Sequence, residues 1–258
     1  MNKDIGSLLN NWEYAPGELK VRKVVGADGR DKIQIRMDLG LMQLEWTGRP
    51  DAQKPHGCES LLSFYQTKKV DGEGPRAEHA FRLSRQDCWA LAQEAMQYYW
   101  RRISFFELKE YEGAESDADH NLAILDLCNR YAEHDEDRQM AEQYSVFVTA
   151  HRFQARALAQ LEHEDYQSGL AEIRAGIEQV EALLAEQGKL DYAAECPELL
   201  FLKEWEGEVE RSRPLSQVEQ LQADLQMAVE QENFERAATL RDRLRCIETG
   251  SSAAAESS

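Results

Sequence analysis

Residues 216–248 read SQVEQLQADLQMAVEQENFERAATLRDRLRCIE and contain two apolar stripes at helical spacing. The first stripe consists of Val218, Leu221, Leu225, Ala228 and Val229, and the second of Phe234, Ala237, Ala238, Leu240, Leu244 and Ile247. The polar segment 230–233 separates them, so the pattern predicts two antiparallel helices joined by a short turn. Gly250 follows as a predicted C-cap of the second helix.

A capping box marks the start of the first helix. The hydroxyl of Ser216 can accept from an unpaired backbone N–H, and the carboxylate of Glu219 can reach back to the N–H of Ser216. A hairpin of this size cannot bury both apolar stripes by itself. We therefore expect a second copy, the rest of this chain or a different protein to cover it.

The second helix carries the run E-x-F-E-x-A-A-x-L-R-D over residues 232–242. Together with the apolar positions of the first helix, this run resembles the UVR motif of the excision-repair proteins UvrB and UvrC. The resemblance rests on Leu221, Leu225, Ala228, Val229, Glu232, Phe234, Ala237, Ala238, Leu240, Arg241, Asp242, Leu244 and Ile247. In that family the motif is a helical hairpin that pairs proteins, and it also occurs in McsA-like and Clp-protease adaptor proteins.

The resemblance implies a bacterial, non-enzymatic interaction or adaptor protein whose partner is contacted by Phe234, Leu240, Arg241 and Leu244. Two functions remain as alternatives: regulation of a Clp-type protease, and an accessory role in UvrABC nucleotide excision repair. The sequence has no GxxxxGK[ST] loop, no nuclease-like carboxylate cluster and no C-x-x-C pair. Helicase, nuclease and zinc-module functions are therefore not transferred, and we expect no cofactor and no metal.

One local cluster leaves an enzymatic alternative open. The loop 47–58 ends in His56 and Cys58, an imidazole and a thiol that could act as a nucleophile pair if the fold brought them together. A turn leading into a helix is the simpler interpretation. The five cysteines, at positions 58, 88, 128, 196 and 246, lack the close pairs of a disulfide or zinc framework. This spacing predicts reduced thiols.

The N-terminal part of the chain predicts a small antiparallel sheet. Residues 21–25 and 33–37 alternate apolar and polar side chains, and the Asp28-Gly29 pair between them is a strong hairpin signal. Residues 41–46 offer a third strand. We therefore expect a β-meander.

The middle of the chain is predicted to be helical. Residues 59–69 show helical spacing, and residues 70–80 form a polar, glycine-rich connection. Ser84 with Asp87 gives a capping signature for a long helix. A further short helix is expected over residues 198–210.

A faint repeat with an offset of 55 residues relates two parts of this helical region. In both copies an acidic turn is followed by a tyrosine, Tyr111 or Tyr166, and a small residue, Ala114 or Gly169, stands three positions later. This arrangement resembles a tetratricopeptide-type helix pair, in which small residues let helices approach closely. An ordinary helical bundle built by the same packing rules is the alternative.

The net charge of −18 is concentrated in the middle of the chain. Residues 111–215 hold nine Lys and Arg against 24 Asp and Glu, a net charge of −15. Such a surface repels phosphate backbones, so we expect no direct nucleic-acid contact. Residues 1–10 lack the apolar stretch of a secretory signal, and no apolar run approaches the roughly 20 residues that cross a bilayer. These features predict a cytoplasmic protein without membrane contact.

Together these patterns predict an α+β fold that is mainly α. Four regions are expected: an N-terminal β-rich domain with one helix (1–83), an acidic helical region (84–213), a UVR-like hairpin (214–250) and a disordered tail (251–258). The hairpin is expected to dock a protein partner, and self-association stays open.

Overall fold

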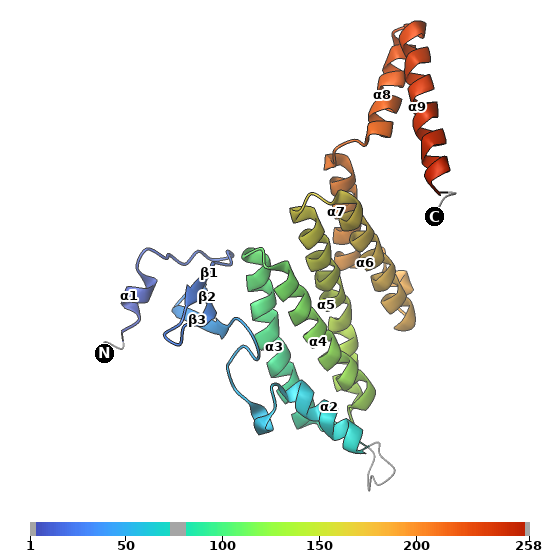
Figure 1. The fold of residues 1–258 in the computed structure, drawn as a ribbon. Coiled ribbons are helices and arrows are strands. Elements are labelled where there is room, and N and C mark those ends of the chain that lie inside the picture. Colours follow the sequence, from blue (N-terminus) through green and yellow to red (C-terminus); the bar gives the residue numbers. More distant parts are fainter. Residues whose placement is uncertain (1–3, 73–80, 256–258) are drawn as a thin grey trace. The chain divides into compact units, whose positions relative to one another are not determined.

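The computed structural model describes the backbone of residues 4–72 and 81–255, and the side chains of residues 4–70 and 81–247. The chain forms two compact units, Met1–Val209 and Glu210–Ser258, which are described separately. The first unit combines a small sheet with a series of long helices, and the second is a helical hairpin (Figure 1). The predicted fold class, α+β and mainly α, is confirmed.

Three antiparallel strands form the sheet in the order β1-β2-β3. They are β1 (Val21–Val25), β2 (Asp31–Met37) and β3 (Gly40–Glu45). The predicted turn at Asp28-Gly29 is confirmed. Gly29 adopts a φ of 76°, which glycine tolerates, and the Gly26 N–H donates to the carbonyl oxygen of Arg30 at 2.8 Å.

The central strand β2 is buried on both faces. On one face, Ile33 and Ile35 are fully covered and pack in a cluster with Phe105. Each of these isoleucines stabilises the fold by roughly 1.5–3 kcal/mol through its removal from water. On the other face, the side chain of Gln34 is also buried, and its Oε1 accepts from Nε of Arg22 at 2.9 Å. The hydrogen bond offsets the cost of burying this amide.

The helices that precede the hairpin are α1 (Gly6–Leu9), α2 (Leu61–Gly72), α3 (Arg85–Glu107), α4 (Tyr111–Tyr131), α5 (Asp135–Glu162), α6 (Tyr166–Glu186) and α7 (Pro197–Ser212). The helices predicted over residues 59–69 and 198–210 correspond to α2 and α7. Part of the connection predicted over residues 70–80 belongs to α2, and its residues 73–80 lie outside the described residues. The capping box of Ser84 and Asp87 is present at the start of α3.

A carboxylate of α3 caps the start of α2. Glu94 is fully buried, and its two oxygens accept from the backbone N–H of Leu61 at 2.7 Å and of Leu62 at 3.1 Å. Its Oε1 also lies 3.1 Å from Nε2 of His120 on α4. These contacts connect three helices through one side chain, and they satisfy backbone donors that a helix start leaves unpaired.

Helices α3 to α6 pack each on the next along the chain (Figure 1). Tyr111 and Tyr166 are the first residues of α4 and α6, so the predicted repeat corresponds to two helix pairs, α3–α4 and α5–α6. The small residues allow close approach, as expected: Ala114 is fully buried, and a Cβ on Gly169 would lie 2.7 Å from the side chain of Leu161. The tetratricopeptide likeness itself stays a prediction.

The same type of turn joins both helix pairs. Lys109 and Glu164 adopt φ values of 58° and 60°, in the left-handed region. In each turn the N–H of the next residue donates to the carbonyl oxygen five residues earlier, at 2.8 Å after Lys109 and 3.1 Å after Glu164. This is the Schellman motif, which satisfies the unpaired carbonyls of a helix end.

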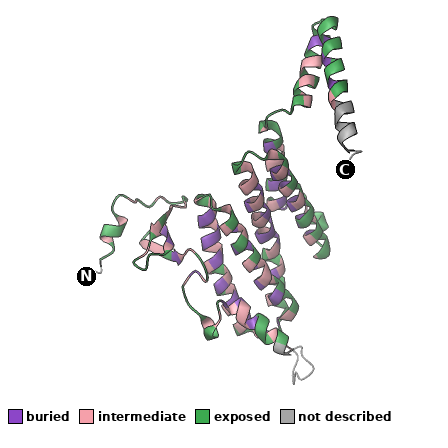
Figure 2. Ribbon diagram, in the orientation of Figure 1, coloured by how far each residue is buried: buried purple, intermediate pink, exposed green. Residues whose placement is uncertain are grey.

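The buried side chains of the helical region form two main clusters, visible as the buried inner faces of the helices (Figure 2). One cluster lies around α2, α3 and α4 and includes Leu91 and Ile124. The other lies around α5, α6 and α7 and includes Ile173, Leu199 and Leu202. The helical region therefore has two apolar clusters in its interior despite its acidic composition.

Candidate functional site: the C-terminal hairpin

The second unit is an αα-hairpin of α8 (Gln217–Glu230) and α9 (Phe234–Ala255), which lie antiparallel and side by side (Figure 1). Alanines and leucines make the contact between the helices. Ala228 of α8 is buried with Ala237 and Leu240 of α9, and Leu221 and Leu225 pack against them. The predicted hairpin is confirmed.

The helix α9 does not end where the sequence predicts. A C-cap at Gly250 was expected, but α9 continues to Ala255, so this prediction is wrong. Glycine inside a helix costs roughly 1 kcal/mol, and the alanines that follow have the highest helix propensity. Of the tail predicted over residues 251–258, residues 256–258 lie outside the described residues.

The predicted capping box at the start of α8 is present. The Ser216 N–H donates to Oε2 of Glu219 at 2.8 Å, and the Glu219 N–H donates to Oγ of Ser216 at 3.2 Å. Nη1 of Arg213 also donates to Oε2 of Glu219 at 2.8 Å. The Arg213 guanidinium and the Ser216 N–H lower the pKa of Glu219 to about 2. The carboxylate therefore stays ionised and caps α8 at neutral pH.

The turn of the hairpin has the geometry of the two turns in the first unit. Glu232 adopts a φ of 56°, and the Asn233 N–H donates to the carbonyl oxygen of Ala228, five residues earlier, at 2.8 Å. Oδ1 of Asn233 then accepts from the Arg236 N–H at 3.2 Å and caps α9. The first helical residue, Phe234, corresponds in position to Tyr111 and Tyr166.

Three apolar side chains near this turn are exposed. Phe234 is 70% exposed, and Met227 and Val229 near the end of α8 are 49% and 47% exposed. In contrast, the corresponding Tyr111 and Tyr166 are partly buried. Figure 2 shows the hairpin mostly exposed, with its buried residues between the helices. Met227 and Val229 lie two positions apart in α8 and therefore face different sides of this helix. We call the exposed surface around Phe234 the turn patch.

The four residues predicted to contact a partner occupy two kinds of position. Phe234 and Arg241 are exposed. Leu240 and Leu244 are only 7% and 8% exposed, and Leu240 packs between the two helices. The helical spacing in the sequence could not distinguish the exposed pair from the buried pair, because both helices present apolar residues on more than one face.

The enzymatic alternative in the loop 47–58 receives no support from its geometry. The ring of His56 stacks on Phe64 with 4.0 Å between centroids. The thiol of Cys58 lies 4.0 Å from the carbonyl oxygen of His56. These positions correspond to a turn before α2, which is the simpler of the two interpretations.

Two arginines that follow the aromatic run at positions 98–100 are unavailable to nucleic acid, because Arg101 and Arg102 are 4% and 0% exposed. None of the five cysteines forms a disulfide, and Cys246 on α9 is the exposed one. Within the described ranges, no cluster of His, Cys, Asp and Glu could hold a metal ion. No helix in the described part of the chain is long and apolar enough to cross a bilayer.

The second unit belongs to the class of αα-hairpins, two antiparallel helices joined by a short turn. Residues 216–249 match the family model UVR, described as the UvrB/uvrC motif. The resemblance seen in the sequence is therefore confirmed for the hairpin, and the motif is an interaction motif rather than a catalytic one. Neither a curated protein nor a solved structure matches the chain.

Proposed function

We propose that this chain is a non-enzymatic adaptor that docks a protein partner through its C-terminal hairpin. The single observation that carries the proposal is the turn patch, because Phe234 is 70% exposed at a position where the first unit has partly buried tyrosines. A large aromatic side chain exposed on a short motif is a typical interface anchor. The match of residues 216–249 to the UvrB/uvrC motif supports the same role.

The proposed contact combines direct and indirect roles for the predicted residues. Phe234 and Arg241, which are exposed, touch the partner directly. Leu240 and Leu244, which are buried, maintain the hairpin whose shape the partner binds. A substitution of Leu240 therefore weakens docking by opening the hairpin, whereas a substitution of Phe234 weakens it with the helices intact.

The favoured function concerns a Clp-type protease in the cytoplasm. The chain either regulates this protease or supplies it with substrates. The absence of a nucleotide-binding loop and the net charge of −15 over residues 111–215 support a role that needs neither hydrolysis nor DNA contact. An accessory role in UvrABC excision repair is the second candidate, and the UvrB/uvrC description of the motif favours it. In that role the chain binds a repair protein rather than DNA.

The test is a binding measurement with the full chain against immobilised Clp ATPase, UvrB and UvrC. Phe234→Ser should weaken binding by about 30-fold or more, as expected of an interface anchor. Leu215→Ser is the matched control, since Leu215 is 55% exposed just before α8, at the end of the hairpin away from the turn. Equal loss in both variants, or no loss in Phe234→Ser, would reject the turn patch as the docking surface.

A further inference from the structure

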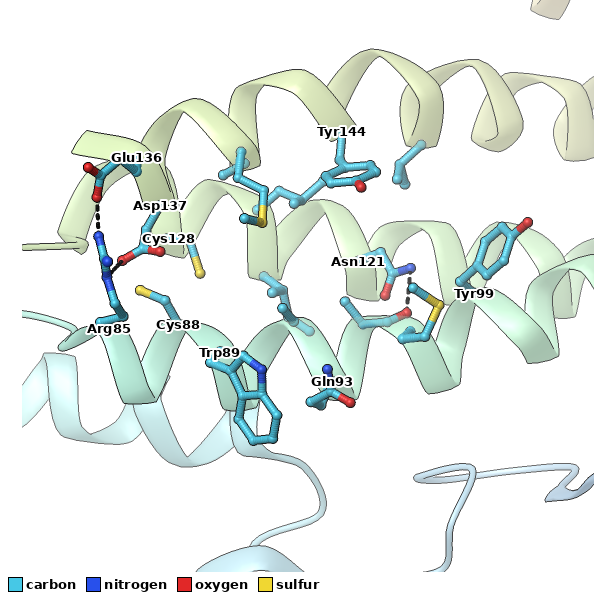
Figure 3. Close-up of a pocket in the computed structure, with 18 of the residues that line it drawn as sticks. Arg85, Cys88, Trp89, Gln93, Tyr99, Asn121, Cys128, Glu136, Asp137 and Tyr144 are labelled. Atoms are coloured by element: carbon cyan, nitrogen blue, oxygen red, sulfur yellow. Dashed lines mark hydrogen bonds and ion pairs between the residues drawn. The ribbon is translucent and has the colours of Figure 1, made fainter. Parts of the chain in front are cut away.

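Two cysteines that are far apart in the sequence lie together in the first unit. Cys88 stands in the first turn of α3, and Cys128 stands in the last turn of α4. Their thiols point toward each other and are hydrogen-bonded (Figure 3). Both side chains belong to the apolar cluster around α2, α3 and α4. The fold therefore brings two thiols into direct contact at one end of the α3–α4 helix pair.

The backbone fixes these two helix ends to each other beside the cysteines. The N–H of Leu83 donates to the carbonyl oxygen of Tyr131 at 2.9 Å, and the carbonyl oxygen of Leu83 accepts from the Glu133 N–H at 2.9 Å. These bonds make an isolated parallel bridge between Leu83 and Ala132, both of which are fully buried. A disulfide forms without strain only where the backbone already holds two cysteines close together. The bridge supplies this restraint.

The two thiols differ in their acidity. The hydrogen bond that the Cys128 thiol donates lowers the pKa of Cys88, although burial and nearby carboxylates such as Asp137 oppose this effect. The same hydrogen bond, together with burial, raises the pKa of Cys128. A thiolate rather than a thiol is the nucleophile. Cys88 is therefore the sulfur that reacts first, and Cys128 is the one that retains its proton.

The pair borders a groove along α3, α4 and α5. The groove has a volume of about 680 Å³, and both cysteines are among its lining residues (Figure 3). Hydrogen peroxide has one oxygen atom more than water, whose share of liquid volume is roughly 30 Å³. The groove therefore admits this oxidant to the pair. Larger reagents are hindered, because Cys88 and Cys128 are only 6% and 7% exposed.

A third buried cysteine of the first unit provides the contrast. Cys196 is 1% exposed, and its thiol donates to a carboxylate oxygen of Glu198 at 3.4 Å. Burial in particular raises the pKa of Cys196, so its sulfur stays protonated. A buried cysteine of this kind is inert. The pair of Cys88 and Cys128 differs because one thiol donates to the other.

We propose that Cys88 and Cys128 form an oxidation site, which hydrogen peroxide converts to a disulfide between α3 and α4. The Cys88 thiolate attacks one peroxide oxygen and the O–O bond breaks, which leaves a sulfenic acid on Cys88. The released hydroxide takes up the proton that Cys88 lost and becomes water. The sulfur of Cys128 then attacks the sulfenic sulfur, the S–O bond breaks, and a second water leaves with the Cys128 proton. The two thiols lose two electrons in total, and these reduce the peroxide.

The disulfide closes the chain into a loop over residues 88–128. A cross-link over a loop of this length restricts the unfolded chain and stabilises the fold. Disulfides of proteins in reducing compartments are usually transient and redox-sensing. The site therefore acts as a reversible clamp on the α3–α4 helix pair, closed by peroxide and opened by thiol reductants.

The test treats the full chain with a small excess of hydrogen peroxide, and then alkylates the remaining thiols in denaturant. Trypsin releases Cys88 and Cys128 in the peptides 86–101 and 110–130. Mass spectrometry should find these peptides joined, at the sum of their masses less two hydrogen atoms, and dithiothreitol should separate them. Cys196 should oxidise at least about tenfold more slowly than the pair. The urea midpoint of the oxidised chain should exceed that of the reduced chain.

Three serine variants identify the roles of the thiols. In Cys128→Ser the hydroxyl can still donate to Cys88, but no second thiol is present, so a sulfenic acid should accumulate on Cys88 and react with dimedone. In Cys88→Ser the thiol of Cys128 should stay reduced. Cys246→Ser is the matched control, because it removes the exposed thiol and should leave the cross-link unchanged.

Three results would overturn the proposal. The first is that Cys88 and Cys128 both remain open to alkylation in denaturant after a peroxide treatment that has oxidised Cys246. The second is that Cys246→Ser abolishes the link between the two peptides. The third is a sulfenic acid on Cys128 of Cys88→Ser but none on Cys88 of Cys128→Ser, which contradicts the assigned order of attack.

Discussion

Arg101 and Asp117 form a bidentate ion pair inside the first unit, with Nε donating to Oδ2 at 2.9 Å and Nη2 donating to Oδ1 at 2.6 Å. Nη1 of the same guanidinium donates to the carbonyl oxygens of Glu45 at 3.1 Å and of Gly48 at 2.6 Å. The pair therefore attaches the end of β3 and the following loop to α3 and α4. The sheet is held on the helices by this polar connection as well as by the cluster around Phe105.

Asp117→Ala should destabilise the first unit by about 3–5 kcal/mol, because it leaves the buried Arg101 charge without its partner. Urea unfolding followed by circular dichroism measures the change. Asp126→Ala is the control: Asp126 forms an exposed i,i+4 pair with Arg130 and should cost less than about 1 kcal/mol. Comparable losses in the two variants would show that burial does not determine the strength of these pairs.

Removal of the Glu94 carboxylate should release the start of α2. In Glu94→Ala the N–H groups of Leu61 and Leu62 lose their acceptors, and we expect a loss of roughly 3 kcal/mol or more for a buried charged hydrogen-bonding group. Hydrogen exchange of residues 61–64 should accelerate more than exchange in α4. Glu107→Ala, at an exposed position of α3, should change neither the free energy of unfolding nor the hydrogen exchange of residues 61–64.

Gly176→Ala should destabilise the packing of α5 on α6. An added Cβ would lie 2.7 Å from Cβ of Phe153, an atom that cannot move without its helix. We expect a loss of about 1–3 kcal/mol from overpacking, measured as a lower denaturation midpoint. Gln179 is exposed on the same helix, and the free energy of unfolding of Gln179→Ala should stay within about 0.5 kcal/mol of the wild-type value.

Glu164→Gly should stabilise the protein by up to about 1 kcal/mol. A left-handed conformation costs an L-residue roughly 1–2 kcal/mol, and this exceeds the extra chain entropy that glycine loses. Glu162→Gly, two residues earlier and within α5, should instead destabilise by about 1 kcal/mol. Thermal melts of the two variants in parallel would show shifts of opposite sign, and shifts of the same sign would contradict the strained turn.

The stability of the first unit should fall as the pH drops from about 6.5 to about 4. Burial, and then the charge of Arg102, lower the pKa of His151 from 6.5 to about 4 in the folded state. Below pH 6.5 the unfolded chain therefore binds a proton that the folded chain does not, which favours unfolding by at most about 1.4 kcal/mol per pH unit. In His151→Phe this part of the pH dependence should disappear, and an identical pH profile would reject the assignment.

Local signals in the sequence predicted local structure well. The capping boxes at Ser84 and Ser216 and the turn at Gly29 each depend on residues within four positions of one another. The 55-residue offset also identified two helix pairs, because the tyrosines stand at the starts of α4 and α6. The motif in the hairpin was recognisable because its spacing is specific.

The polar interior was not predictable in the same way. Glu94 and Arg101 stand in an amphipathic helix where charged residues usually face solvent, and their burial depends on partners far away in the sequence. No feature of the neighbouring sequence distinguishes these buried residues from the exposed Glu107.

The exposure of Cys246 on α9 gives this protein a built-in labelling position. Cys88, Cys128 and Cys196 are buried, and Cys58 is partly covered. A maleimide dye added to the unaltered chain should therefore couple first to Cys246, on the same helix as Phe234. The polarisation of that dye would report the arrival of a partner at the hairpin in real time, without an engineered cysteine or a fusion tag.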